Sequence, residues 1–561
     1  MAPFFEKLQK FHPKLPFFTN PKEVFQVPIM GSTNSRRLLL SSVFKPFAVD
    51  DEFGVKENVC ELMHNQVTRL QGVFSVRSHN RSFGLSFIAE NLQVPTTVLD
   101  FPTQEEFVAE ITRNRYSHIG ISFIVPNVEK ARRLCELARK HSPNSVIIAG
   151  GHGTRIPGIK EYIGCDEVCV GEGIVWLRRF FDEPVEAPFR HPVMRVDCYR
   201  QLLGVEVPHS KAILVPGVGC ANKCYFCATS HFFDGYRPFF PTPESLFSEM
   251  EKIADGLDTR HFFVLDENFL DDPKRIGRLV ELMEARSRPF VLDIFSSLRA
   301  ISQYDPLLLV RLGVQFVWIG VESKRALFDK VKDIDASSVI GNLRRHGISV
   351  LASAILFLDH HDETTLWEDV HYTIGLRPDF TQFMQLAPLP GTALYQRLEA
   401  QGRIRHEIPW TGWHGQHKIW FRHPIFSPDD SRRILDEAFR MDFEILGPSL
   451  MRVAETRLTG LRSITATFDR FLARRFSDMR IAALEMKPLL WAFITQAPNQ
   501  TVRFRAKHLL KDYERELGPF SLRDRVEMGI VNLISRIASR RYKHGRAIRQ
   551  PKTWVDRYRW T

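Results

Sequence analysis

The sequence contains no long uninterrupted apolar run. A helix that crosses a bilayer needs about 18 or more consecutive apolar residues, and no stretch of the 561-residue chain is that long. Residues 1–20 also lack the apolar segment and small-residue cleavage site of a secretory signal. We therefore expect a cytoplasmic protein without a membrane-spanning segment.

Cysteine is scarce as well, and its distribution is uneven. Only eight cysteines occur in the chain, and three of them, Cys220, Cys224 and Cys227, form one tight cluster. In a reducing compartment such a cluster indicates metal ligation rather than disulfide bonds.

Most of the chain has no excess of charge of either sign. The net charge is +11, and residues 431–561 carry 27 Lys and Arg against 14 Asp and Glu, which leaves the preceding residues close to neutral. With 44% hydrophobic and 25% charged residues, the composition is that of an ordinary globular protein, and the length suggests about three domains.

The first part of the chain predicts an irregular arm at residues 1–35, followed by an α/β domain at residues 36–205. β-rich runs alternate there with helical segments, one of which begins at a Thr103 cap. Strands are expected at 38–43, 96–101, 119–124 and 146–149, and helices at 84–92 and 128–140. This alternation predicts a Rossmann-like domain, in which a parallel sheet has helices on both faces.

Residues 206–425 repeat a strand-then-helix pattern six times. The expected strands are 213–216, 261–265, 290–294, 316–320, 350–357 and 380–387. Six units are too few for a complete eight-unit barrel, so a partial barrel is expected, with its chemistry at the carboxyl ends of the strands.

Residues 426–561 predict a basic helical domain, with helices expected at 463–475 and 523–540. In the second of these, Val526, Ile530, Leu533 and Ile537 recur at helical spacing beside several arginines.

The cysteine cluster lies in the loop after the first expected barrel strand. Three cysteine thiolates can hold three irons of a cubane cluster, and the missing fourth cysteine leaves one iron open to a substrate or cofactor. The alternative is a structural zinc site in which His231 supplies the fourth ligand. A zinc site of that kind usually stabilises a small domain that lacks a core, and this region needs no such support.

The CxxxCxxC spacing, with Phe226 before the third cysteine, resembles the signature of the radical S-adenosylmethionine superfamily. The resemblance implies a (βα)6 partial barrel and a 4Fe-4S cluster whose open iron binds S-adenosylmethionine and cleaves it to a 5′-deoxyadenosyl radical. Such chemistry implies an electron donor such as flavodoxin or ferredoxin.

The same resemblance implies that Phe226, in the cysteine loop, binds the cofactor. It also implies cofactor-binding residues at three further strand ends: Asp266, Glu267, Glu322, Ser323 and Pro388. Acidic side chains there suit ribose hydroxyls or the amino group, and nearby glycines permit close approach. Ordinary salt-bridged acids at strand ends are the alternative for the three carboxylates.

Glycine-rich strand ends in the first domain resemble the cobalamin-binding domain of one large class of these enzymes. The implied cofactor-binding residues are Ser122, Asn127, Gly150, Gly151, Thr154, Gly171, Glu172 and Gly173. Ligands of open α/β sheets bind beyond the carboxyl ends of strands, where these motifs fall. No Asp-x-His-x-x-Gly motif occurs, so no histidine ligand for cobalt is expected. A nucleotide-binding or cofactor-free domain is the alternative.

The leading hypothesis is therefore a cobalamin-dependent radical S-adenosylmethionine enzyme that methylates an unactivated carbon of a lipid-like or other small-molecule substrate. Radical cyclisation, rearrangement or carbon–carbon coupling without methyl transfer is a second hypothesis. A non-catalytic cobalamin or iron–sulfur sensor is a third, from another class.

The basic tail suggests a peripheral contact with the inner face of a membrane, because cationic amphipathic helices bind anionic lipid. Nucleic acid is the less favoured partner. A solvated helical cap without a partner is the remaining interpretation.

Overall fold

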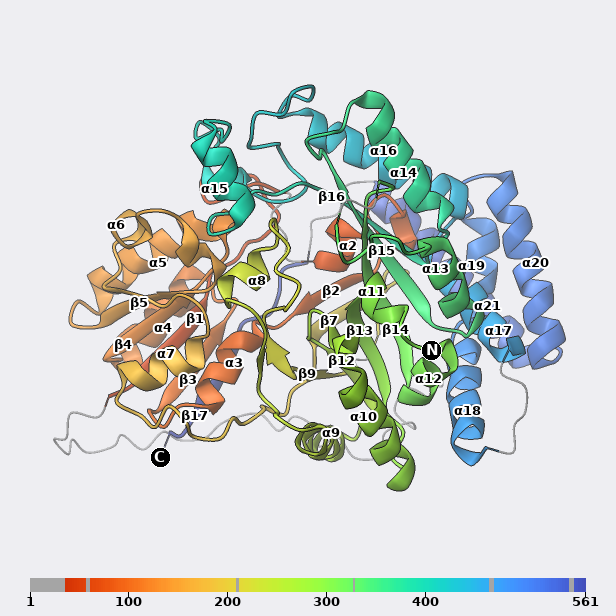
Figure 1. Ribbon diagram of the computed structural model, residues 1–561, viewed down its shortest axis with the longest axis horizontal. Coiled ribbons are helices and arrows are strands. Elements are labelled where there is room, and N and C mark those ends of the chain that lie inside the picture. Colours follow the sequence, from red (N-terminus) through yellow and green to blue (C-terminus); the bar gives the residue numbers. More distant parts are fainter. Residues whose placement is uncertain are drawn as a thin grey trace. The chain divides into compact units, whose positions relative to one another are not determined.

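The computed structural model describes residues 36–56, 61–207, 211–325, 328–463, 469–543 and 549–560, and residues 37–561 form one compact unit (Figure 1). The irregular arm predicted at residues 1–35 lies outside the described residues.

The N-terminal sheet has five parallel strands in the order β3-β1-β4-β5-β6. They are β1 (Leu38–Ser42), β3 (Thr96–Asp100), β4 (His118–Ser122), β5 (Val146–Gly150) and β6 (Glu167–Val168). The predicted strands and the Rossmann-like arrangement are confirmed.

Helices cover both faces of this sheet because successive strand residues point to opposite sides. Leu39 packs in one core with α4 (Gln104–Asn114) and α5 (Val128–His141). Leu38 and Leu40 pack in another with α3 (Phe83–Glu90) and α7 (Gly173–Phe180). The predicted Thr103 cap is also confirmed, since its hydroxyl accepts the N–H of Glu106 at 3.1 Å.

A second sheet of six parallel strands follows, in the order β16-β15-β14-β13-β12-β9. Its strands are β9 (Ala212–Leu214), β12 (His261–Val264), β13 (Val291–Ser297), β14 (Val314–Glu322), β15 (Ser349–Leu356) and β16 (Phe380–Gln385). The intervening helices are α9 (Pro243–Leu257), α10 (Pro273–Ala285), α12 (Pro306–Leu312), α13 (Ala336–Arg345) and α14 (Glu363–Gly375), and α15 (Ala393–Ala400) follows the last strand. All six predicted strands are present, and the chain order of the strands is kept across the sheet, as in a partial barrel.

The C-terminal region is helical, as predicted. Its helices are α16 (Asp430–Leu446), α17 (Ser449–Ser463), α18 (Arg470–Leu484), α19 (Leu490–Thr495), α20 (Gln500–Leu517) and α21 (Leu522–Lys543). A single helix over 463–475 is wrong, because Asp469 has an extended backbone and caps α18, which begins at Arg470. None of the described helices is long and apolar enough to cross a membrane.

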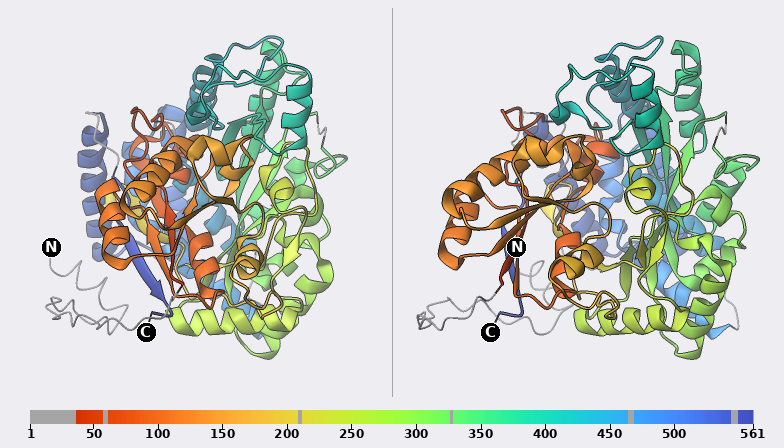
Figure 2. Two further views of the ribbon diagram at one scale, coloured as in Figure 1. Left: turned by 90° about the vertical axis from the view of Figure 1, so that its left-hand side faces the viewer. Right: turned by 60° about the vertical axis from the view of Figure 1, so that its left-hand side comes forward.

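Two long-range features were not predicted. Strand β17 (Trp554–Tyr558) pairs antiparallel with β3, so the end of the chain completes the edge of the N-terminal sheet (Figure 2). Residues 67–76 of the predicted N-terminal domain share a core with α17, α19 and α20, where the rings of Phe74 and Phe493 lie 5.6 Å apart.

Candidate functional site

The cysteine loop begins at a turn that only glycine can make. Strand β10 (Gly217–Val218) pairs antiparallel with β11 (Arg237–Pro238) and closes the base of the loop. Between them, Gly219 has φ +83°, and a Cβ atom there would lie 1.8 Å from the carbonyl oxygen of Gly235. A glycine directly before Cys220 is therefore a steric requirement of the loop.

The three cysteines of this loop carry free thiols. Cys220 is buried, and Cys224 and Cys227 are half-buried; the N–H of Cys227 donates to the carbonyl of Cys224 at 3.0 Å. Burial raises the pKa of Cys220 to about 11. It also raises the pKa of Cys224, although the nearby Lys330 offsets part of that increase. A bound metal would supply the positive charge that holds such thiols as thiolates.

The potential ligand atoms of the cysteine loop are spread more widely than the ligands of a zinc site. In a tetrahedral zinc site with Zn–S distances near 2.3 Å, sulfur atoms lie about 3.8 Å apart. Among the described residues, the one group of three potential ligands within 4.8 Å of one another contains none of these cysteines. The ring Nδ1 of His231 lies 2.9 Å from the carbonyl oxygen of Cys227. Three thiols without a fourth suit a cubane cluster with one open iron.

A buried ion pair adjoins the cysteine loop. Glu322, at the end of β14, is buried with φ +57° and forms an ion pair with Lys330. The Lys330 ammonium also lies 5.6 Å from the ring centre of Phe226. Burial alone would lower the pKa of Lys330, but Glu322 and Cys224 outweigh it and the net effect is a higher pKa. Sequence reasoning missed Lys330 because no local pattern marks it.

The two acids after β12 have different surroundings. Asp266 is buried, and its carboxylate accepts hydrogen bonds from the hydroxyl of Tyr236 at 2.8 Å, the N–H of Asn268 at 3.1 Å and the guanidinium of Arg275 at 3.2 Å. Those bonds give Asp266 a structural role. Glu267 is exposed as a whole residue, but protein atoms surround its carboxyl group. This burial and the nearby Asp266 raise the pKa of the carboxyl group.

The segment that follows β16 is hydrogen-bonded to the cysteine loop at the start of α15. The N–H of Leu394 donates to the carbonyl of Tyr225 at 2.9 Å, and the carbonyl of Pro388 accepts the indole N–H of Trp420 at 3.0 Å. The ends of the first and last barrel strands are thereby held together around the cysteines.

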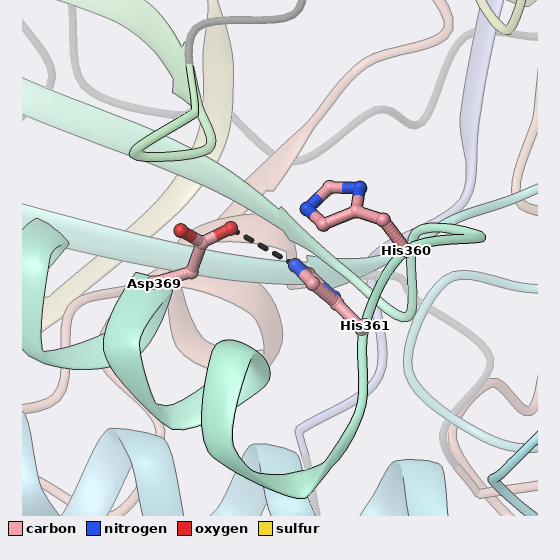
Figure 3. A group of neighbouring side chains, drawn as sticks. All are labelled: His360, His361 and Asp369. Carbon is pink, nitrogen blue, oxygen red and sulfur yellow. Dashed lines mark hydrogen bonds and ion pairs between the residues drawn. The ribbon is translucent and has the colours of Figure 1, made fainter.

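Ser323 forms a side-chain hydrogen bond with Asp369. Asp369 belongs, with His360 and His361, to a group of neighbouring side chains (Figure 3). Asp369 accepts from the ring Nε2 of His361 at 3.0 Å and from the N–H of Lys324 at 2.9 Å. The other ring nitrogen of His361 accepts the N–H of Leu358 at 3.1 Å. Both ring nitrogens and both carboxylate oxygens are thus used, so we assign this group a structural role and no metal.

The predicted cobalamin residues meet at the carboxyl edge of the N-terminal sheet, since Ser122 is in register with Gly150. Several of them are needed by the fold itself. Gly151 has φ +84°, and a Cβ there would lie 2.6 Å from the carbonyl oxygen of Phe123. The hydroxyl of Thr154 donates to the carbonyl of Gly151 at 2.8 Å.

The remaining members of this edge differ in how much space surrounds them. Glu172 caps α7 by accepting the N–H groups of Ile174 and Val175. Asn127 is buried at the start of α5, and a Cβ at Gly173 would lie 2.8 Å from Ile88. By contrast, a Cβ at Gly150 would have one neighbour at 4.0 Å, and one at Gly171 a neighbour at 3.5 Å. Gly150 and Gly171 are therefore the members with room for a ligand.

The two carboxyl edges contact each other through α8 (Ala228–Phe232), which follows Cys227 directly. The guanidinium of Arg155 donates to the carbonyl of His231 at 3.1 Å, and the ring of His152 stacks on Phe232 with centres 4.4 Å apart. These four residues and Gly391 line one cavity. Burial and Arg155 lower the pKa of His152 to about 4, so its ring is neutral near pH 7. A separate cavity at Val291 and Gly313 lies at the opposite, amino ends of the strands.

We predict that removing Lys330 alone destabilises the fold more than replacing Glu322 and Lys330 together. Lys330→Met would leave a buried carboxylate without compensation, which costs about 3 kcal/mol, whereas Glu322→Gln/Lys330→Met should regain most of that loss. Urea unfolding of the cofactor-free protein measures both. The matched control is Lys324→Met, which breaks an exposed pair with Glu368 and should cost less than about 0.5 kcal/mol. Equal effects of the two lysine substitutions would contradict the prediction.

Parts of the chain match known proteins. The B12 binding domain family matches residues 73–179. The chain is 23% identical over 339 residues to the anaerobic magnesium-protoporphyrin IX monomethyl ester cyclase of Rubrivivax gelatinosus, which covers 53% of this chain and 61% of the relative. It is 24% identical over 223 residues to the hopanoid C-2 methylase of Rhodopseudomonas palustris, covering 38% of this chain and 40% of the relative.

Among solved structures, the radical S-adenosylmethionine methyltransferase TsrM of Kitasatospora setae has the same fold, with a TM-score of 0.51 at 13% identity over 80% of this chain and 100% of that one. The chain spans less than two thirds of the length of the curated relatives. The chain thus carries a match to the B12-binding domain before a three-cysteine loop on a partial barrel, and it shares its fold with a radical S-adenosylmethionine methyltransferase.

Proposed function

We propose that this protein binds a 4Fe-4S cluster, S-adenosylmethionine and cobalamin, and that it methylates an unactivated carbon of a lipid-like or other small-molecule substrate. When bound, these groups supply reductive cleavage of S-adenosylmethionine and a transferable methyl group. The observation that carries the proposal is the contact of Arg155 and His152 with α8, because it joins the glycine-rich edge of the B12-binding domain to the cysteine loop.

Cys220, Cys224 and Cys227 would hold the cluster, and the side chains around them would orient S-adenosylmethionine. Glu322 already binds a cation, Lys330, so its carboxylate suits the cofactor's amino group. Glu267 is open to solvent and close enough to Cys220 to influence its pKa, which suits a bond to a ribose hydroxyl. Asp266, with three protein hydrogen bonds, would act by fixing this loop.

Gly150 and Gly171 would let the cobalamin ring approach the N-terminal sheet. Neither nearby histidine suits the lower face of cobalt: His118 begins β4, at the opposite edge of the sheet, and His152 stacks on Phe232. The proposal therefore contains no histidine ligand.

The relatives support carbon methylation and also the second hypothesis. One is named a hopanoid C-2 methylase and the other a cyclase. The first name favours a lipid-like substrate, and the second keeps cyclisation without methyl transfer as a candidate. Either reaction would need an electron donor such as flavodoxin or ferredoxin, so the proposal includes a cytoplasmic location. A lipid-like substrate would bring it to the inner face of a membrane.

Protein purified without oxygen should be brown and contain about four irons per chain. Cys224→Ala should remove most of the iron and abolish reductive cleavage of S-adenosylmethionine, because one of three cluster ligands is lost. Cys165→Ala is the control, since Cys165 is buried in the core of the N-terminal domain. Iron analysis and 5′-deoxyadenosine assay measure the outcome. Colourless protein with one zinc per chain would refute the cluster.

Full-length protein should retain about one hydroxocobalamin after gel filtration, in a base-off form. Gly150→Leu should retain less than about a tenth as much, because its side chain would extend into the open space at the end of β5. The control is Gly277→Leu, at a remote glycine of α10 where an added Cβ would have no neighbour within 4 Å. Gly151 is unsuitable, since its φ makes any side chain strain the fold. Failure of the unmodified protein to retain cobalamin would contradict the proposal.

The reaction itself is tested with S-adenosylmethionine that carries a labelled methyl group. Incubated with reductant and a lipid extract of cells that encode the protein, the loaded enzyme should form 5′-deoxyadenosine and transfer label to a lipid. Formation of 5′-deoxyadenosine with an altered but unlabelled product would favour cyclisation or rearrangement. Loaded protein that forms neither would favour the sensor hypothesis.

A further inference from the structure

Helix α21 exposes one continuous apolar stripe. Leu522 is 81% exposed, Leu533 59%, Val526 52%, Ile537 44% and Ile530 40%. With about 100° of rotation per residue, these five side chains fall within an arc of about 80°. A chain that folds alone gains nothing from such a stripe, and contiguous exposed apolar surface marks an interaction site.

The orientation of α21 is fixed by its opposite face. Met528, Ser535 and Ala538 are buried, and Ala538 packs against Gly204 so closely that a Cβ on that glycine would lie 2.6 Å from it. On the same helical projection these small or flexible side chains lie between about 120° and 180° from the centre of the stripe. The apolar stripe therefore cannot turn inward without breaking the core beneath the helix.

Exposed arginines border the stripe on both sides. Arg523 and Arg541 follow one border, and Arg525 and Arg536 follow the other, with Arg540 at the C-terminal end of the stripe. The two acids of the helix lie off the stripe and are already paired, Asp524 with Lys487 at 3.2 Å and Glu527 with Arg523 at 3.2 Å. The stripe itself is thus apolar, and the charges along its borders are mostly positive.

We propose that this face of α21 docks on an anionic lipid bilayer, with the helix lying in the plane of the interface. Apolar side chains would enter the acyl boundary while the long arginine side chains reach the phosphates. Two copies of the chain would instead bring arginines against arginines, and a nucleic acid backbone would leave the apolar stripe uncovered. The inference does not depend on the radical chemistry, so either can fail alone.

Other parts of the basic region do not share this role. The ring of Trp560 is 4.9 Å from the guanidinium of Arg37, and that of Trp554, the first residue of β17, is 4.9 Å from Arg81. Both tryptophans are thus packed on protein. Truncation before α21 would also remove β17, so single-residue substitutions are the sharper test.

Full-length protein should co-sediment with vesicles of phosphatidylcholine and phosphatidylglycerol, be released as salt rises, and ignore vesicles of phosphatidylcholine alone. Val526→Asp/Leu533→Asp should weaken the partition coefficient about 100-fold. Arg536→Gln/Arg540→Gln should weaken it about 30-fold. The control Ile481→Asp alters an equally exposed apolar residue, 53% exposed on α18, and should bind like the unmodified protein.

Each variant is first checked for unchanged thermal unfolding and iron content, which separates docking from folding and from cluster chemistry. Equal binding to neutral and anionic vesicles, or anionic binding that Val526→Asp/Leu533→Asp leaves intact, would overturn the proposal. So would a dimer in light scattering that this double variant dissociates, which would identify a second copy as the occupant. Binding to an oligonucleotide that only the arginine variants weaken would identify nucleic acid instead.

Discussion

The contact between Arg155 and α8 is the interaction on which the proposed chemistry depends. Arg155 stands just beyond β5, and its guanidinium reaches the carbonyls of His231 and Phe232, a few residues after the last cysteine. Each of the two sheets has its functional side chains at its carboxyl edge, because parallel strands end together there. The contact brings the cysteine loop to the edge of the B12-binding domain, and neither sheet alone offers both sets of residues.

Charge compensation is the second constraint on the site. Three thiols, Glu322 and Glu267 lie at the barrel mouth, and each of them adds negative charge when it is ionised. Lys330 is the nearby cation, and the increase in its pKa shows that its anionic neighbours outweigh the cost of burial. It neutralises Glu322 in the structure described here. A cofactor ammonium at Glu322 would release Lys330 to balance the thiolates, so one lysine could serve the site in both states.

The features that could be predicted from the sequence are those with local signals. Six strand-and-helix units, the Thr103 cap and the cysteine spacing are each encoded within a few residues, and all are present. Strand β17 was missed because its pairing with β3 joins segments more than 450 residues apart, and five residues carry no period that reveals it. Lys330 was missed for a similar reason: its role depends on the fold bringing it to Glu322. Asp266 and Glu267 look alike in sequence, and only the positions of Tyr236 and Arg275 distinguish them.

Helix α21 is another case in which the sequence alone does not predict the surroundings of the side chains. Its apolar period is visible in the sequence, but an amphipathic period predicts an apolar face and not what covers it. In most helices of a globular protein that face is the core-facing one. Here Met528, Ser535 and Ala538 form the buried face, and Ala538 packs closely on Gly204. Val526, Ile530, Leu533 and Ile537 are consequently turned to solvent between arginines. The close packing of the inner face therefore determines which side of the helix is exposed, and that side is the proposed docking surface.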